Sequence, residues 1–214
     1  PSPAVTFSAR ADSLSVASVK QLWPYWFGKK ARHWIIENMA GGVVKNAAID
    51  VSLAAGRIPE HPEPLVFGEN EMHISFDAED TTVRFLPEMP RAIKTSGHFL
   101  MQDRHILINI GKGSIALPSG KSIDGQAGVF EIADISKKPL MATVDINASG
   151  DASAVAEFAS FKPVDAMSRA PFKAADLGGK VKANELHAAY SSYCKKHGFT
   201  AMTQNDNRWP LALK

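Results

Sequence analysis

The sequence predicts a mainly β protein, with a long antiparallel meander sheet and a few helices. From Val43 to Ser149 most segments alternate apolar and polar residues, which is typical of strands with one apolar face. Turn-forming residues separate these segments every 10–20 residues or so, roughly the spacing of a meander. Helical periodicity is confined to residues near 25–39, 152–162 and 184–197. No βαβ pattern results, so a parallel doubly wound sheet is not expected.

The composition limits the kinds of protein that this chain can be. The 214 residues suffice for one or two domains, and 45% apolar with 21% charged residues is ordinary for a globular chain. A net charge of +2 is too small to indicate, by itself, a nucleic-acid or membrane partner. The single Cys194 excludes an intramolecular disulfide framework. Because the chain begins at Pro1 without Met or a leader, we expect a fragment or processed product that lacks its targeting or anchor segment.

The first elements are a strand, two helices and a glycine pair. The stretch AVTFSARADSLSV within residues 1–17 alternates and predicts a strand. A short helix is expected to be capped by Ser18, and Pro24 suits the first turn of the next helix. Gly41 and Gly42 are expected to end that second helix in a positive-φ conformation and to turn the chain into the sheet.

The strands that follow each present one apolar face. In the first of them the odd-numbered residues are apolar, with only Lys45 breaking the run. The candidates for a continuous apolar surface are Val43, Ala47, Ile49, Val51, Leu53, Met72, Ile74, Phe76, Val83, Phe85, Ile106, Ile108 and Ile110. Such faces either bury each other in a closed sandwich or barrel, or form an open curved sheet whose concave side holds an apolar ligand. The residues alone leave both interpretations open.

No constellation of residues is typical of an enzyme. The segment GSIALPSGKS has the wrong spacing for a phosphate-binding loop and predicts a hairpin turn. The positions of His98 and His105 suit a pair facing each other across one hairpin, but structural zinc requires four ligands. Cys194 falls on the apolar side of its helix, and the acidic residues 77–80 are expected in a solvated turn. We therefore predict a non-enzymatic protein without cofactor or metal.

The segment LWPYWFGKKARHWIIENMAGGVVKNAAIDVSL, within residues 18–53, carries a recognisable pattern. It combines a Trp-Pro, an Arg-x-Trp on a helix, an Asn near the helix end, a glycine pair and an outgoing amphipathic strand. These positions are Trp23, Pro24, Arg32, Trp34, Asn38, Gly41 and Gly42, followed downstream by Pro90 and Gly97. The pattern resembles the large AsmA-like envelope proteins of Gram-negative bacteria, of the AsmA, TamB and YhdP type, in their alphaproteobacterial form. The resemblance covers about residues 5–182.

The resemblance implies both a fold and a function. Such proteins are similar to bridge-like lipid transporters, which are anchored in the inner membrane, cross the periplasm and carry phospholipid toward the outer membrane in an apolar β-sheet groove. It implies no catalytic residues, and a packing role for the Trp-Pro and Arg-x-Trp residues. The expected partners are a phospholipid or other acyl lipid and the rest of the parent envelope protein, with no nucleic acid.

The resemblance ends before the C-terminus. We therefore expect an AsmA-like β-groove segment over 1–182 and a helical tail over 183–214. The tail is weakly similar to helical modules at the ends of phage and plasmid primases. Two other functions stay open at this point: an envelope assembly scaffold with no lipid cargo, and a nucleic-acid-binding module that uses the C-terminal helix.

Overall fold

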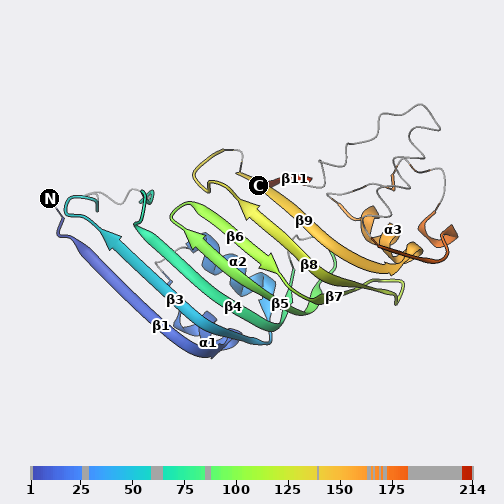
Figure 1. Cartoon of the computed structure of the whole chain (residues 1–214), viewed down its shortest axis with the longest axis horizontal. Helices are drawn as coiled ribbons and strands as arrows, with labels where there is room; N and C mark the ends of the chain where they lie inside the picture. Colours follow the sequence, from blue (N-terminus) through green and yellow to red (C-terminus); the bar gives the residue numbers. More distant parts are fainter. Residues whose placement is uncertain are drawn as a thin grey trace.

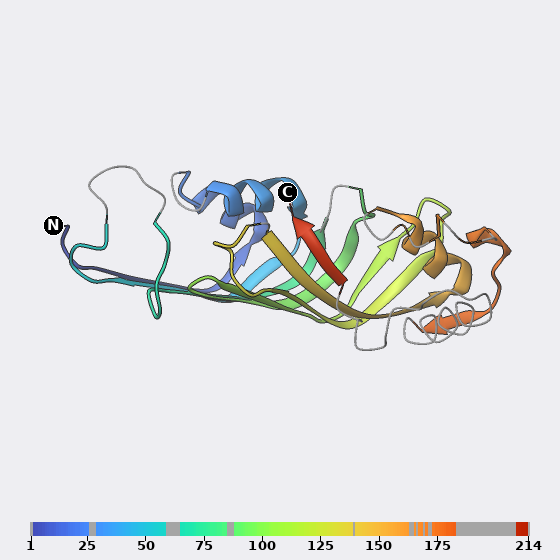
Figure 2. The same ribbon diagram turned by 90° about the horizontal axis from the view of Figure 1, so that it is seen from above.

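The protein is built on one long, curved antiparallel sheet with helices on one side of it (Figures 1 and 2). The computed structural model describes residues 2–25, 29–58, 65–84, 88–138, 140–162, 173–182 and 209–213, together with Asp165, Met167, Ser168 and Ala170. Among the described residues, no helix has the length and hydropathy required to span a bilayer.

Eleven strands and three α-helices make up the described fold. The strands are β1 (Val5–Ser15), β2 (Met39–Ala40), β3 (Val43–Leu53), β4 (Met72–Val83), β5 (Ala92–Gln102), β6 (His105–Ile110), β7 (Gly113–Ala116), β8 (Ser122–Ile132), β9 (Leu140–Asp151), β10 (Lys180–Lys182) and β11 (Trp209–Leu213). The helices are α1 (Val16–Leu22), α2 (Lys29–Asn38) and α3 (Ala152–Ser160), with a 3₁₀ turn at Ala174–Asp176.

The strand order confirms the predicted antiparallel meander. The main path is β1-β3-β4-β5-β6-β8-β9-β10, and every pairing along it is antiparallel. The short strands fill the margins: β2 pairs with β4, β7 bridges β5 and β8, and β11 pairs with β9. The expected fold class, mainly β with a long curved sheet and a few helices, is therefore confirmed.

The helices agree with the sequence in place but differ in detail. The first two expected ranges correspond to α2 and α3, and the third, 184–197, lies outside the described residues. The expected cap at Ser18 is wrong, because the Ser18 N–H donates to the Ser15 hydroxyl at 3.0 Å and Ser15 is the N-cap of α1. Of the predicted tail, residues 209–213 form β11 at the edge of the same sheet, and the boundary at 182 stays a prediction.

The glycine pair turns the chain into β3 with the predicted positive φ, but it does not end the helix, because α2 ends at Asn38 and β2 lies between the helix and the glycines. Gly41 and Gly42 have φ angles of 63° and 71°, which a residue with a Cβ rarely adopts. A Cβ at Gly42 would also collide with the Glu79 carbonyl oxygen. The Gly42 carbonyl in turn accepts the Val16 N–H at 3.2 Å, so the turn into β3 also holds the start of α1.

Four β-bulges bend the sheet. Asn46 (φ 51°), Asp80 (φ 53°) and Lys94 (φ 51°) each lie where the pairing register shifts by one residue, and a fourth shift lies between Gly125 and Ala127 of β8. Each bulge inserts an extra residue and reverses the alternation of side chains beyond it. The expected turn over residues 77–80 is therefore wrong, because β4 runs unbroken from Met72 to Val83 and accommodates Asp80 as a bulge.

Two strand glycines permit close approach of neighbouring backbones. A Cβ at Gly97 would lie 2.7 Å from the Asn109 carbonyl oxygen, and one at Gly128 would lie 2.7 Å from the Asp145 carbonyl oxygen. Both residues pair with Ile110, one from each side. Glycines and bulges of this kind are the usual means of curving a sheet, and Figure 2 shows the sheet bowed toward the helices.

Candidate functional site

The candidate site is the face of the sheet that the helices contact, here called the inner face. Val16 of α1 and Ile35 of α2 pack in a cluster with Val44, Val83 and Phe76 of the sheet. At the other end of the sheet, Val155 and Phe158 of α3 pack over Ile123. Pairing through β5 and β7 places both clusters on the same face, in agreement with Figure 2.

Almost all side chains on the inner face are apolar. On the central strands they are Val44, Ala47, Ile49, Val51 and Leu53 of β3, Met72, Ile74, Phe76, Thr81 and Val83 of β4, Thr95, Phe99 and Met101 of β5, Ile106, Ile108 and Ile110 of β6, and Ile123, Phe130 and Ile132 of β8. The surface therefore crosses the five strands β3, β4, β5, β6 and β8 and is not confined to one hairpin.

Most of the predicted surface residues lie on this face. The exceptions are Val43, whose predicted place on this face is wrong, and Phe85, which lies outside the described residues. The bulge at Asn46 reverses the alternation, so Val44 packs inward with the helices while Val43 and Lys45 point to the opposite face. This also explains why Lys45 interrupts the odd-numbered apolar run.

The middle of the inner face is only half-buried. The half-buried residues here are called the central strip, which consists of Ile74, Phe76, Phe99, Met101, Ile106, Ile108, Ile110 and Phe130. Two rows cross the strands here by direct pairing, one through Phe76, Phe99 and Ile108 and the other through Ile74, Met101 and Ile106. The Phe76 and Phe99 rings stack with centroids 4.8 Å apart and planes inclined by 12°. At the margins, Phe7 is 53% exposed and Ile146 is 40% exposed.

Sequence reasoning missed part of this surface. Phe99, Met101 and Phe130 lie beside the predicted isoleucines, but they were not among the candidates. Alternation in GHFLMQ and GVFEIA shows which residues share a face within each strand. It does not show which of the two faces points inward, and only the cross-strand register decides that.

The opposite face, here called the outer face, carries the charges. Lys45 pairs with Glu79 at 2.6 Å, and Arg10 pairs with Asp50 at 2.9 Å. Asn46 donates to Asp77 at 2.8 Å, and this hydrogen bond, with that from His98, lowers the pKa of the Asp77 carboxyl. The sheet is therefore polar on one face and apolar on the other, as expected when only one face lies against apolar material.

The expected meeting of His98 and His105 is wrong. The register pairs His98 with Asn109 and His105 with Gln102, so the two imidazoles lie at different levels of the hairpin. Each has its own acidic partner: His98 Nδ1 lies 2.7 Å from Asp77, and His105 Nε2 lies 2.9 Å from Glu131. Across the described residues, no group of three or more His, Cys, Asp or Glu side chains is arranged to hold a metal ion.

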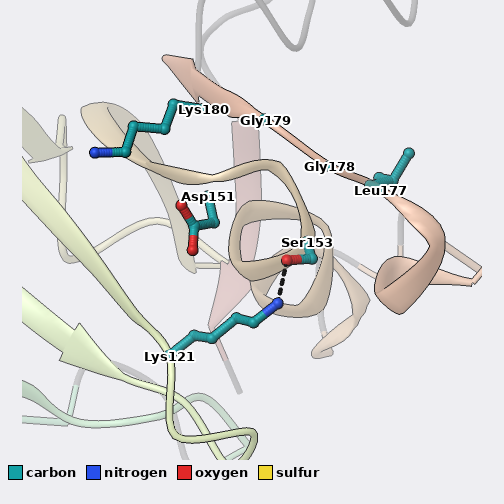
Figure 3. Close-up of a pocket in the computed structure, with 7 residues that line it drawn as sticks. All are labelled: Lys121, Asp151, Ser153, Leu177, Gly178, Gly179 and Lys180. Carbon is teal, nitrogen blue, oxygen red and sulfur yellow. Dashed lines mark hydrogen bonds between the residues drawn. The ribbon is translucent and has the colours of Figure 1, made fainter.

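A shallow cavity of about 400 Å³ lies beside the start of α3 (Figure 3). Lys121, Asp151, Ser153 and Lys180 line it together with residues 177–179. Lys121 belongs to the segment GSIALPSGKS, and the hairpin turn predicted there connects β7 to β8. The Lys121 ammonium group donates to the Ser153 hydroxyl and so ties this turn to α3. The Ala152 N–H donates to the Gly179 carbonyl at 2.8 Å, which fastens β10 to the same helix.

The motif residues of α2 hold the helical layer together. The Arg32 Nε donates to the Trp23 carbonyl at 3.1 Å, which joins the Trp-Pro segment to the helix. Asn38 donates to the Trp34 carbonyl at 2.9 Å and accepts from Arg84 at 3.2 Å, which joins the end of the helix to β4. Trp34 itself is 36% exposed and lies outside the apolar cluster that α2 forms with the sheet.

Comparison with known proteins adds no relative. No family model, no curated protein and no solved structure matches this chain, so the resemblance to the AsmA-like proteins stays a prediction.

Proposed function

We propose that this chain is a non-enzymatic lipid-binding segment of an envelope protein of the bridge-like lipid transport type. In this proposal the acyl chains of a phospholipid lie on the central strip. The observation that carries it is the half-buried apolar strip in the middle of a curved, one-sided sheet. A continuous apolar surface of this kind commonly marks a site for an apolar ligand or partner.

Burial of acyl chain on such a surface supplies enough affinity without any catalytic group. Each methylene removed from water contributes about 0.8 kcal/mol, so about eight methylenes contribute about 6 kcal/mol. This corresponds to a dissociation constant of roughly 40 µM before any headgroup contact. Binding of this strength is reversible, which suits transport better than storage.

The cellular setting of the proposal comes from the pattern in residues 18–53. We propose a periplasmic location, with the parent protein anchored to the inner membrane and lipid moving toward the outer membrane. The C-terminal helix behind the nucleic-acid alternative lies outside the described residues, and no observation favours that function.

The test compares one inner-face variant with one outer-face variant of the same strand. Ile108→Glu places a carboxylate in the central strip, whereas Asn109→Glu places the same group on the outer face next to it. The wild-type chain is expected to release phospholipid into organic solvent, as seen by mass spectrometry, and to bind a fluorescent fatty acid. Ile108→Glu should weaken fatty-acid binding by at least about tenfold, because burying a carboxylate costs several kcal/mol. Asn109→Glu should leave the affinity within about twofold of the wild-type value.

Two controls keep the test decisive. Circular dichroism shows whether Ile108→Glu still folds, and Ile108→Thr is the milder substitute if it does not. A wild-type chain that carries no phospholipid and binds no fatty acid, or equal loss in both variants, would contradict the proposal.

The scaffold alternative has one observation in its favour. Among the described residues, β1 pairs only with β3, so eleven residues leave backbone groups along one edge of the sheet without a strand partner. Such an edge readily pairs with another chain. A tightly associated protein neighbour together with absence of lipid would favour this alternative.

A further inference from the structure

The edge strand β1 lacks the usual features that keep a sheet edge from pairing. Among the described residues it pairs only with β3, in a constant register over its whole length. Edge strands are commonly protected by lysines, by proline or by a bulge. The strand contains no proline, and its only charged residues are Arg10 and Asp12. Arg10 is turned toward β3, where its Nη2 lies 2.9 Å from both carboxylate oxygens of Asp50.

The contacts of Arg10 also show which backbone groups of β1 face the open side. Its Nη1 donates to the Ala9 carbonyl at 2.9 Å and to the Ile49 carbonyl at 3.3 Å, so both carbonyls lie between β1 and β3. Ala9 and Ile49 are therefore a hydrogen-bonded pair of the ladder. Because such pairs alternate along an antiparallel ladder, Thr6, Ser8 and Arg10 direct their N–H and C=O groups away from β3. These groups suit a ladder with one more strand.

The inner-face side of β1 is apolar and incompletely covered. Val5, Phe7, Ala9 and Ala11 lie opposite inner-face residues of β3. Phe7 is 53% exposed, more than any other large hydrophobic residue of the described strands. A further strand beside β1 would cover Phe7 and would widen the apolar inner face.

The two edges of the sheet differ, and this difference limits how copies of the chain can join. At the far edge, most of β9 is paired with β10 and β11, which belong to the same chain. Growth from β1 of one copy to β9 of the next would have to displace these strands. Figure 1 shows β1 as the outermost strand at the opposite edge. Contact between two β1 edges requires no displacement, and such an isologous contact closes after two copies.

We propose that two copies of this chain join through their β1 strands, antiparallel, about a two-fold axis at Ser8. An axis perpendicular to the sheet makes the two strands antiparallel and keeps both inner faces on the same side. Val5 then lies opposite Ala11 of the second copy and Phe7 opposite its Ala9, so each larger apolar side chain meets a small one.

The charges of β1 agree with this register. Arg10 lies opposite Thr6 of the second copy, so no like charges meet. An axis at Arg10 would instead place two arginines opposite each other and would leave Val5 opposite Ser15. The apolar residues at 5, 7, 9 and 11 are centred on Ser8, so this register alone matches all four. The inference depends on the strand edge and is independent of whether the inner face carries lipid.

The test measures the mass of the full chain by sedimentation equilibrium over a range of concentrations. One chain has a mass of 23.1 kDa, and we expect twice this mass as the concentration rises. Ser8→Pro removes the N–H that each copy donates at the axis, and should weaken self-association by at least about tenfold. Ser8→Thr keeps the N–H and the hydroxyl, and should leave self-association within about twofold of the wild-type value. Circular dichroism shows whether Ser8→Pro still folds.

Cysteine substitutions test the register without disturbing the ladder, in a chain that also carries Cys194→Ser. In a hydrogen-bonded pair the two Cα atoms at position 8 lie about 5.5 Å apart, within disulfide range. Position 13 is five residues from the axis, so its two copies are separated by roughly 30 Å. Oxidation should therefore cross-link Ser8→Cys into a dimer and leave Ser13→Cys monomeric.

The outcomes are distinct. A chain that stays at the monomer mass at every concentration, an edge that binds a different protein instead, or equal cross-linking of Ser8→Cys and Ser13→Cys would overturn the proposal. Loss of the dimer in Ser8→Pro with fatty-acid binding retained would show that the edge and the inner face act separately.

Discussion

Curvature of the sheet depends on glycines where neighbouring backbones come close, and β8 offers a matched pair to test this. A Cβ at Gly128 would lie 2.7 Å from the Asp145 carbonyl oxygen and 3.2 Å from the Ile146 Cα. A Cβ at Gly125, three residues away on the same strand, would meet only the Gly113 carbonyl oxygen, at an ordinary 3.6 Å. Neither glycine has a positive φ, so alanine suits the backbone conformation at both positions.

The two substitutions should change the free energy of unfolding in opposite directions. Alanine at either position removes freedom from the unfolded chain, which stabilises by about 0.4–1 kcal/mol. At Gly128 the added methyl group forces β8 and β9 apart, and overpacking of this kind costs about 1–3 kcal/mol. Gly125→Ala is therefore expected to stabilise slightly. Gly128→Ala is expected to destabilise by about 1–2 kcal/mol, because its shortest contact is with a backbone carbonyl oxygen, which cannot rotate away as a flexible side chain can.

Urea unfolding followed by circular dichroism measures the difference. With a denaturant dependence of about 2 kcal/mol/M, a gap of about 2 kcal/mol separates the two midpoints by about 1 M. Equal midpoints for Gly125→Ala and Gly128→Ala would refute the idea that close backbone approach at Gly128 shapes the sheet.

Three further predictions concern the core and the loops. Ile123→Ala, at a side chain only 2% exposed beneath α3, should lower the free energy of unfolding by about 3 kcal/mol in urea titrations, whereas Ile93→Ala, 37% exposed, should change it by less than about 1 kcal/mol. Hydrogen bonds from Arg57 and the Gly68 N–H lower the pKa of Glu71 from 4.5 to about 2, so its contribution to stability is complete above about pH 4.5 and lost as the pH falls through about 2. Glu71→Gln should therefore reduce the loss of unfolding free energy between these pH values. Parallel profiles of unfolding free energy against pH for the wild type and Glu71→Gln would contradict this. Asp103→Ala removes a carboxylate that accepts the N–H groups of Asn70, Glu71 and Met72, each at 2.8 Å, at a position with φ 54°. The free energy of unfolding should fall by about 2 kcal/mol in the same titrations. An unchanged urea midpoint would show that water replaces the carboxylate as hydrogen-bond acceptor.

The elements that sequence located best are those with strong local signals. Alternation identified the long strands, and the pair Gly41-Gly42 marked the turn into β3, where both residues have a positive φ. The site was predicted less completely. Candidates such as Ile74 and Ile108 lie on the inner face, but Val43 does not, and Phe99 was missed. An extra residue at a bulge reverses a strand's faces without altering its composition, so no local pattern reveals it.

The sequence by itself determined that this chain forms an antiparallel sheet with an apolar and a polar side to each strand, because side-chain alternation is a property of the strand alone. Tertiary structure decided which of those sides meet. Cross-strand register and the bulges of β3, β4, β5 and β8 bring the apolar sides of successive strands onto one face. The helices then cover the two ends of that face but not its middle. Register depends on contacts between residues far apart in the chain, and for that reason it appears only when the strands are placed side by side.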